Sequence, residues 1–271
     1  MKKIALILLI LSQTLLLAGC SFQNTEVKPV NPLAKEEASF IVTANTHMLQ
    51  TLDKNIFGNK TPEKMILYVE ETPEGMPQSW SLVVDGVEKV KLFHEDGLYS
   101  FAKVALADID NDQRDEVLLY RQSSGSAGAM GLNVYKASEN NLQQIFSNEN
   151  EMNPSSPRFE VKYMGDYYVK FEDKETGLKA VIELDQKQYS NLEDMLNNIA
   201  TWIDPIADYS LVDYNGDGIK EIITIQRVIG ISHADTIGLL KTTFKMEQNQ
   251  YKATTLTLCD SKDKPLAEVK L

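Results

Sequence analysis

The chain has 271 residues, a formal net charge of −12 and only two cysteines. The acidic excess argues against nucleic acid, because affinity for nucleic acid comes from lysine and arginine side chains that neutralise phosphates, and it argues equally against electrostatic attachment to anionic lipid headgroups. The length allows one or two domains with an adequate core that needs no disulfide.

The N-terminus has the form of a secretory signal, with two lysines followed by an apolar run that ends at Leu17. The next residues, Leu17-Ala-Gly-Cys20, resemble the lipobox of bacterial lipoproteins, in which the cysteine is diacylated and becomes the new N-terminus after cleavage. The apolar run is shorter than the roughly 20 residues that a spanning helix needs, which makes an uncleaved membrane anchor the weaker alternative.

We therefore expect residues 1–19 to be a signal peptide and Cys20 to carry the lipid. Residues 20–37 are mostly polar and predict a flexible tether behind the lipidated cysteine. The lipid would hold the protein at the extracytoplasmic face of the cell membrane.

Residues 38–150 are predicted to form a first β-rich unit. Met65–Glu70 has the composition of a strand, and Asp85-Gly86 suits a two-residue hairpin turn between two further apolar stretches. Between Ala38 and Phe57 the pattern does not separate helix from strand. Further strands are predicted at 80–84, 87–93, 117–120, 132–135 and 142–146.

Residues 151–271 are predicted to form a second β-rich unit, after a change of composition near residues 148–158. Apolar stretches at 159–163, 167–171 and 178–184 predict a three-stranded meander. Apolar residues then recur every three or four positions from Tyr189 to Ile203, which predicts a helix that ends before Pro205. Further strands are predicted at 241–246 and 251–258.

Each unit contains a nine-residue acidic loop between two apolar stretches, Asp108–Glu116 in the first and Asp213–Glu221 in the second. Both loops place side-chain oxygens at positions one, three, five and nine. Oxygen ligands from alternating positions suit a hard cation such as Ca²⁺. Gly218 stands where the loop must reverse, a position that favours a residue tolerant of positive φ.

The repeated order of loop and strands predicts a mainly β fold of blade-like antiparallel meanders, propeller-like or a partial propeller, with one or two helices. The spacing of the loops would accommodate two units of about 50 residues. The meander at 159–184 would then be a degenerate unit without a metal loop.

Strand, acidic loop and strand together resemble the calcium loop of FG-GAP and VCBS repeats, which build integrin-type β-propellers. With the lipobox, the chain is similar to bacterial VCBS-repeat lipoproteins, most plausibly those of Gram-positive species. The resemblance implies calcium bound by side chains at positions one, three, five and nine and by the carbonyl at position seven. The implied ligands are Asp213, Asn215, Asp217, Ile219 and Glu221 in the second loop and Asp108, Asp110, Asp112, Arg114 and Glu116 in the first.

Gln113 in the first loop stands where the family pattern has glycine, so we expect the second loop to bind calcium more tightly. An EF-hand is excluded, because position twelve, which needs a bidentate carboxylate, is Leu119 or Thr224. The alternative for both loops is a polar turn that binds no ion, since Asp, Asn and Gly are common turn residues.

Catalysis has little support in the sequence. The three histidines lack the spacing of a metal site, and His233 and Asp235 form at best a weak candidate for an acid–base pair. Cys259 lies in a strand-like stretch and is expected to be a packed side chain. The leading hypothesis is a lipid-anchored binding module with structural calcium and a protein or cell-wall ligand. The alternatives are a cell-envelope hydrolase and an accessory subunit of a membrane complex.

Overall fold

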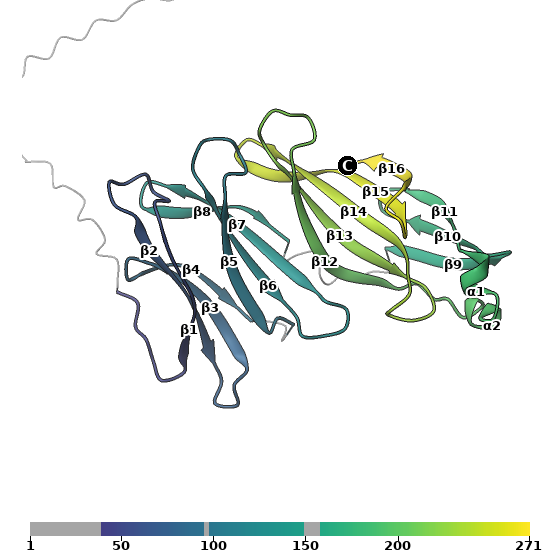
Figure 1. The fold of residues 1–271 in the computed structure, drawn as a ribbon, viewed down its shortest axis with the longest axis horizontal. Helices are drawn as coiled ribbons and strands as arrows, with labels where there is room; N and C mark the ends of the chain where they lie inside the picture. Colours follow the sequence, from purple (N-terminus) through teal and green to yellow (C-terminus); the bar gives the residue numbers. More distant parts are fainter. Residues whose placement is uncertain (1–38, 95–97, 149–157) are drawn as a thin grey trace, which may run out of the picture. The chain divides into compact units, whose positions relative to one another are not determined.

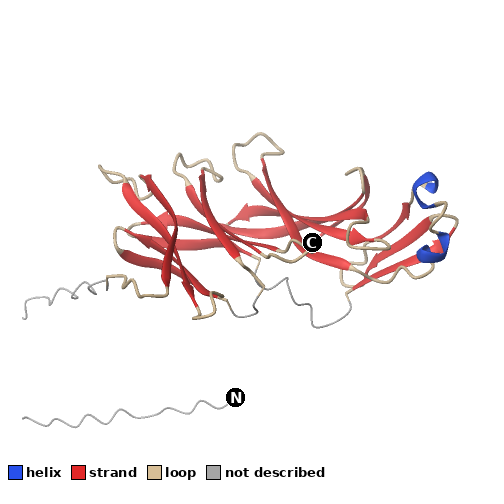
Figure 2. Ribbon diagram, turned by 60° about the horizontal axis from the view of Figure 1, so that its bottom comes forward, coloured by secondary structure: helices blue, strands red, loops and turns tan. Residues whose placement is uncertain are grey.

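The computed structural model describes residues 39–94, 98–148 and 158–271 (Figure 1). These residues form sixteen strands and two helices of one turn each, which confirms the prediction of a mainly β fold (Figure 2). The predicted signal peptide, Cys20 and the tether lie outside them, as do residues 149–157 at the predicted boundary between the two units. Within the described ranges, no helix is long and apolar enough to cross a membrane.

Two four-stranded antiparallel sheets come first, and in each of them strands that follow one another in the sequence are paired. Sheet A contains β1 (Thr46–Lys54), β2 (Glu63–Glu71), β3 (Pro77–Val84) and β4 (Val87–Phe93). Sheet B contains β5 (Phe101–Ala107), β6 (Glu116–Gln122), β7 (Met130–Ser138) and β8 (Asn141–Ser147). The predicted hairpin turn between β3 and β4 is confirmed, because Asp85 and Gly86 both have positive φ, 48° and 83°.

The remaining strands form two further antiparallel sheets. Sheet C contains β9 (Phe159–Gly165), β10 (Tyr168–Asp173) and β11 (Lys179–Glu183), which confirms the predicted three-stranded meander. Sheet D contains β12 (Ile203–Val212), β13 (Glu221–Ile229), β14 (Thr236–Glu247), β15 (Gln250–Asp260) and β16 (Pro265–Lys270). The sequence analysis had assigned no strand to residues 265–270.

Three hydrophobic cores join the sheets in the order A, B, D, C. The first core lies between sheets A and B and includes Trp80 and Leu119. The second lies between sheets B and D, where the Phe146 and Phe244 rings meet edge to face at 5.0 Å. The third lies between sheets D and C around Phe171. The meander of sheet C thus packs on the far side of sheet D, although in sequence it falls between sheets B and D.

Sheets B and D each pack against a core on both faces, which explains apolar runs such as residues 117–119 in β6. In β6, Val117 and Leu119 join the core shared with sheet A, while Leu118 joins the core shared with sheet D. Alternate residues of a strand point to opposite faces, so a strand between two cores has no polar face. The outward side of sheet C is charged instead, with Lys170 and Lys179 both paired to Glu172.

The predicted helix at 189–203 is wrong. The segment contains α1 (Gln186–Tyr189) and α2 (Glu193–Leu196), and Ile203 already belongs to β12. Tyr189, Leu196 and Ile199 are buried in the third core, and this tertiary packing is achieved by two single turns rather than by a continuous helix. Pro205, expected to end the helix, lies in edge strand β12 where the pairing register shifts, a position that tolerates a missing amide donor.

Candidate metal-binding loops

The two acidic loops connect equivalent strands and have the same internal geometry. Asp108–Glu116 joins β5 to β6, and Asp213–Glu221 joins β12 to β13. At position one, the two carboxylate oxygens of Asp108 accept hydrogen bonds from the amides of Asn111 (2.7 Å) and Gln113 (3.0 Å). Asp213 accepts from Gly216 (2.7 Å) and Gly218 (2.9 Å) in the same way.

Positions three and five each accept the backbone amide two residues further on. In the first loop, Asp110 accepts from the amide of Asp112 (3.3 Å), and Asp112 accepts from the amide of Arg114 (2.9 Å). In the second loop, Asn215 accepts from the amide of Asp217 (3.0 Å), and Asp217 accepts from the amide of Ile219 (2.8 Å). Arg114 and Ile219, whose carbonyls are the implied backbone ligands, thus hold equivalent places in the two loops.

Both loops reverse through left-handed residues at positions four and six. These are Asn111 and Gln113 in the first loop, with φ of 64° and 68°, and Gly216 and Gly218 in the second, with φ of 75° and 88°. The expectation of positive φ at Gly218 is confirmed. Gln113 adopts the same conformation without glycine, so the first loop forms the same turn at a strain cost of roughly 1–2 kcal/mol.

The glutamate at position nine is buried in both loops and binds the backbone of position two. Glu116 is 1% exposed and accepts from the amide of Ile109 (2.9 Å), while Glu221 is 4% exposed and accepts from the amide of Tyr214 (3.1 Å). One carboxylate oxygen of each glutamate therefore closes the loop. The other oxygen of Glu221 lies 3.4 Å from the Lys245 ammonium, whereas that of Glu116 has no hydrogen-bond donor among the described residues.

Sheet A contains a third loop of this kind that the sequence analysis missed. Asn55–Glu63 joins β1 to β2, and Gly58 at its fourth position has φ of 74°. Buried Glu63 at position nine accepts from the amide of Ile56 at position two (2.8 Å). Its second oxygen accepts from the side-chain amide of Asn59 (2.7 Å), so a neutral donor satisfies it. The loop lacks aspartates, which is why the motif did not reveal it.

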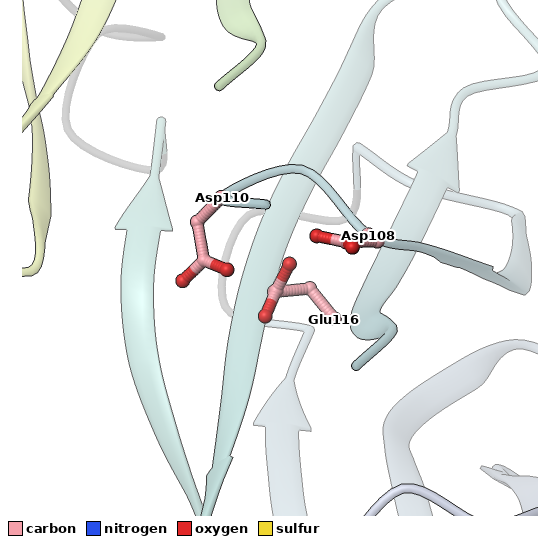
Figure 3. A group of neighbouring side chains, drawn as sticks. All are labelled: Asp108, Asp110 and Glu116. Carbon is pink, nitrogen blue, oxygen red and sulfur yellow. The ribbon is translucent and has the colours of Figure 1, made fainter. Parts of the chain in front are cut away.

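In the first acidic loop, three carboxylates gather around a common point (Figure 3). Asp108, Asp110 and Glu116 each offer an oxygen, and these oxygens lie within 4.8 Å of one another. Among the described residues, no group donates a hydrogen bond to the second oxygen of Glu116. Burial raises the pKa of Glu116 to about 7, although the Ile109 amide opposes the shift. A cation at the common point would satisfy this oxygen.

Each acidic loop also faces a lysine from the second strand after it. Lys136 on β7 is ion-paired with Asp110 and with Asp112 (2.9 Å), and Lys245 on β14 lies 3.4 Å from Glu221. Burial alone would lower the pKa of Lys136, but its hydrogen bonds to the two aspartates outweigh that effect and raise it. The lysine ammonium is thus held in its charged form.

The two acidic loops contact each other across the boundary between sheets B and D. The Asn111 side-chain amide donates to the Asp217 carbonyl (3.2 Å), and the Lys220 amide donates to the Ile109 carbonyl (2.8 Å). The Tyr251 hydroxyl donates to the carbonyls of Lys220 (2.8 Å) and Ile109 (3.3 Å). The two loops are therefore held side by side by direct hydrogen bonds and by the shared Tyr251 hydroxyl.

The structure does not pair His233 with Asp235. Asp235 accepts hydrogen bonds from the Tyr189 hydroxyl and the Ile231 amide (2.9 Å), whereas His233 Nδ1 lies 3.5 Å from Asp204. Asp204 is fully buried and is also ion-paired with Arg227 (2.5 Å). Sequence reasoning missed Asp204, because it lies far from the histidine along the chain.

The chain is thus a mainly β protein of four antiparallel sheets, and two of these sheets carry an acidic loop between their first two strands. Residues 157–259 match a family model described as the YybI C-terminal domain. The uncharacterized protein YybI of Bacillus subtilis (strain 168) is 24% identical over 153 residues, which cover 54% of this chain and 58% of that relative. The chain thus spans less than two thirds of that relative's length. The family match includes the second acidic loop and begins after the first, so the first loop lies outside it.

Proposed function

We propose that this protein is a lipid-anchored, extracytoplasmic binding module whose acidic loops hold calcium as part of the structure. The observation that carries the proposal is the unsatisfied oxygen of Glu116, which is buried beside two further carboxylates. A buried carboxylate oxygen without a partner is costly, and a coordinated cation removes that cost. Calcium is the best match, because all the side-chain ligands offer oxygen.

The role of the ion in this proposal is structural. Each loop joins two strands with buried faces, and the two loops share the Asn111–Asp217 contact between sheets B and D. An ion in the loops would therefore stabilise both the turns and the boundary between the sheets.

We also propose that the four sheets are blade-like repeats of an open, propeller-like stack. Their face-to-face cores and the shared position-nine glutamate of the loops in sheets A, B and D support this view. Sheet C would be a terminal, degenerate blade without a loop of this kind. A crystal structure in which the loops of the three sheets do not superpose would contradict the repeat.

Calcium-dependent stability tests the metal proposal. The unfolding temperature should rise when calcium is added and fall back when a chelator removes it. The same concentration of magnesium should raise it less, because Mg²⁺ is smaller and loses its waters reluctantly. Glu221→Gln keeps an acceptor for the Tyr214 amide (3.1 Å) and removes one ligand charge. It should reduce the calcium shift and leave unfolding in chelator nearly unchanged. An unfolding temperature that ignores calcium in the wild type contradicts the proposal.

A pull-down with the intact lipoprotein from detergent-solubilised membranes tests the binding role. Specific capture of a protein or a cell-wall glycan would support the module, and a stoichiometric membrane complex would favour the accessory-subunit alternative. The hydrolase alternative needs a turnover that disappears in Glu221→Gln while the variant stays folded and calcium-bound.

A further inference from the structure

We propose that Lys136 is a built-in competitor of calcium in the first acidic loop, so that this loop fills after the second. The inference rests on the proposed function, since it concerns the order in which the loops take the ion. Two lysines occupy equivalent positions in sheets B and D, but they form ion pairs with different residues of their loops.

The register of the strands makes the two lysines equivalent. Val117 pairs with Tyr135 in sheet B, and Ile222 pairs with Phe244 in sheet D. Lys136 and Lys245 each follow the second member of these pairs, so each lies opposite the glutamate at position nine of its loop. The two lysine side chains therefore start from equivalent backbone positions, each within reach of the equivalent atoms of its own loop.

The ammonium groups nevertheless reach different ligands. Lys136 is ion-paired with Asp110 and Asp112, two of the implied calcium ligands, and its side chain is 29% exposed. Among the ion pairs of the described residues, Lys245 meets the second loop through Glu221, at 3.4 Å, and its side chain is 48% exposed. Hydrogen bonds are the main cause of the lowered pKa of Asp217, and Lys245 acts on that carboxyl only through its charge, as the last of the influences that lower the pKa. Lys136 is therefore part of the ion-pair network of the first loop, whereas Lys245 lies at the edge of the second.

The difference follows from the residue at position three. In the first loop this residue is Asp110, a charged acceptor for the ammonium. In the second it is neutral Asn215, whose side-chain amide donates to Asp217 (2.8 Å). Asn215 thus supplies the donor that Lys136 supplies in the first loop, and the third loop uses Asn59 similarly on Glu63.

Calcium and the Lys136 ammonium cannot both bind Asp110 and Asp112 closely, because two cations at one set of carboxylates repel each other. Entry of the ion requires both ion pairs to break. Glu116 is not paired with Lys136, so its free oxygen remains as the anchor for an incoming ion. A partly exposed ion pair changes an equilibrium by up to about fivefold, so the two pairs together weaken calcium binding by up to about thirtyfold.

Calorimetric titration of the folded extracytoplasmic chain with calcium tests the inference. The Glu221→Gln background weakens the second loop, so that the first dominates the signal. In that background Lys136→Met should tighten the remaining site by about tenfold, whereas Lys136→Arg, which keeps the charge, should leave it weak. Lys245→Met is the matched control, and in the wild-type background it should change the affinity of the second loop by less than Lys136→Met changes the first.

Unfolding in chelator is the second readout, and it separates competition from simple damage. Lys136→Met should lower the unfolding temperature without calcium and recover it with calcium, because the ion replaces the lost ammonium. An unchanged calcium affinity in Lys136→Met, with calcium still binding to the wild type, overturns the competition and leaves the proposed function intact. If neither the wild type nor any variant binds calcium, both proposals fail.

Discussion

Replacing Gly218 by alanine should disrupt the contact between the two acidic loops. Gly218 has φ of 88°, and an added Cβ would lie 2.6 Å from Cγ of Asn111. Because the obstructing atoms belong to the end of a side chain, Asn111 would rotate away and lose its hydrogen bond to the Asp217 carbonyl. The substitution thus combines backbone strain with the loss of a contact between sheets B and D.

The expected cost separates into two parts. A non-glycine residue in the left-handed region costs roughly 1–2 kcal/mol, partly offset by about 0.4–1 kcal/mol because alanine restricts the unfolded chain. The lost hydrogen bond adds about 0.5–1.5 kcal/mol. Gly218→Ala should therefore lower the free energy of unfolding by about 2 kcal/mol, or the unfolding temperature by about 4–8 °C for a domain of this size.

Gly216→Ala is the matched control, because Gly216 has φ of 75° and its added Cβ would meet no atom within 4 Å. Only the strain remains there, so the control should cost about 1 kcal/mol less than Gly218→Ala. Urea denaturation at one fixed calcium concentration measures both. In an Asn111→Gly background the two alanine variants should become equal. Equal costs in the wild-type background, or a coupling below about 0.3 kcal/mol, would refute the contribution of the Asn111–Asp217 hydrogen bond.

Three further results are expected. Glu221→Gln should lose at least half of the upward shift of unfolding temperature that calcium gives the wild type, and a full shift would exclude Glu221 as a ligand. At Asp173, burial raises the pKa, but hydrogen bonds led by that of Arg158 outweigh it and hold the pKa below 3.8. Its contribution to stability is therefore complete above pH 3.8 and is lost as the pH falls through the folded-state pKa. Asp173→Asn should lower stability at pH 7 by about 1–3 kcal/mol and flatten the acid dependence, and an unchanged acid limb in urea titrations would contradict this. Cys20→Ser should prevent incorporation of labelled palmitate in cells, and a wild type that takes up no label would disprove lipid attachment.

Much of the sheet structure could be predicted because the strands carry strong local signals. The β3–β4 hairpin follows from Asp85-Gly86, and the meander of sheet C follows from apolar stretches separated by turn residues. Strand β1 could not be distinguished from a helix in the sequence, since its residues are mostly exposed and give no alternating apolar pattern. Its place in the fold comes from pairing with β2, which is a tertiary effect.

The helical prediction failed for a related reason. The spacing of apolar residues from Leu192 to Ile203 fits one helical face, yet Met195 is 47% exposed and Ile203 pairs with Val228 in sheet D. Spacing alone does not tell one helix from two short turns followed by a strand. Here the competing strand pairing decided the outcome.

The positions of the acidic loops could be predicted because they depend on local sequence, whereas the groups that surround their carboxylates could not. Lys136 is far from the first loop along the chain, and only the strand register brings it to Asp110. The third loop was hidden for the opposite reason, because it keeps the backbone scheme of Glu63 without the aspartates. In all three loops the glutamate at position nine is the constant element, but its second oxygen meets different surroundings. Asn59 donates to that of Glu63, Lys245 lies 3.4 Å from that of Glu221, and no described residue donates to that of Glu116.

This variation explains why two acidic loops can lie against each other at one sheet boundary. Like charges brought together in a partly buried site repel, and the fold must offset that repulsion. The Lys136 ammonium offsets part of it in the first loop, Lys245 reaches only Glu221 in the second, and Asn215 lowers the charge there by one. A cation bound from solution would offset the rest.

The boundary between sheets B and D should therefore be the part of the molecule most sensitive to calcium. The Lys220 amide donates to the Ile109 carbonyl at 2.8 Å across this boundary, and its hydrogen exchange should slow when calcium is added. If calcium binds but does not change the exchange rate of the Lys220 amide, the ion does not stabilise this boundary.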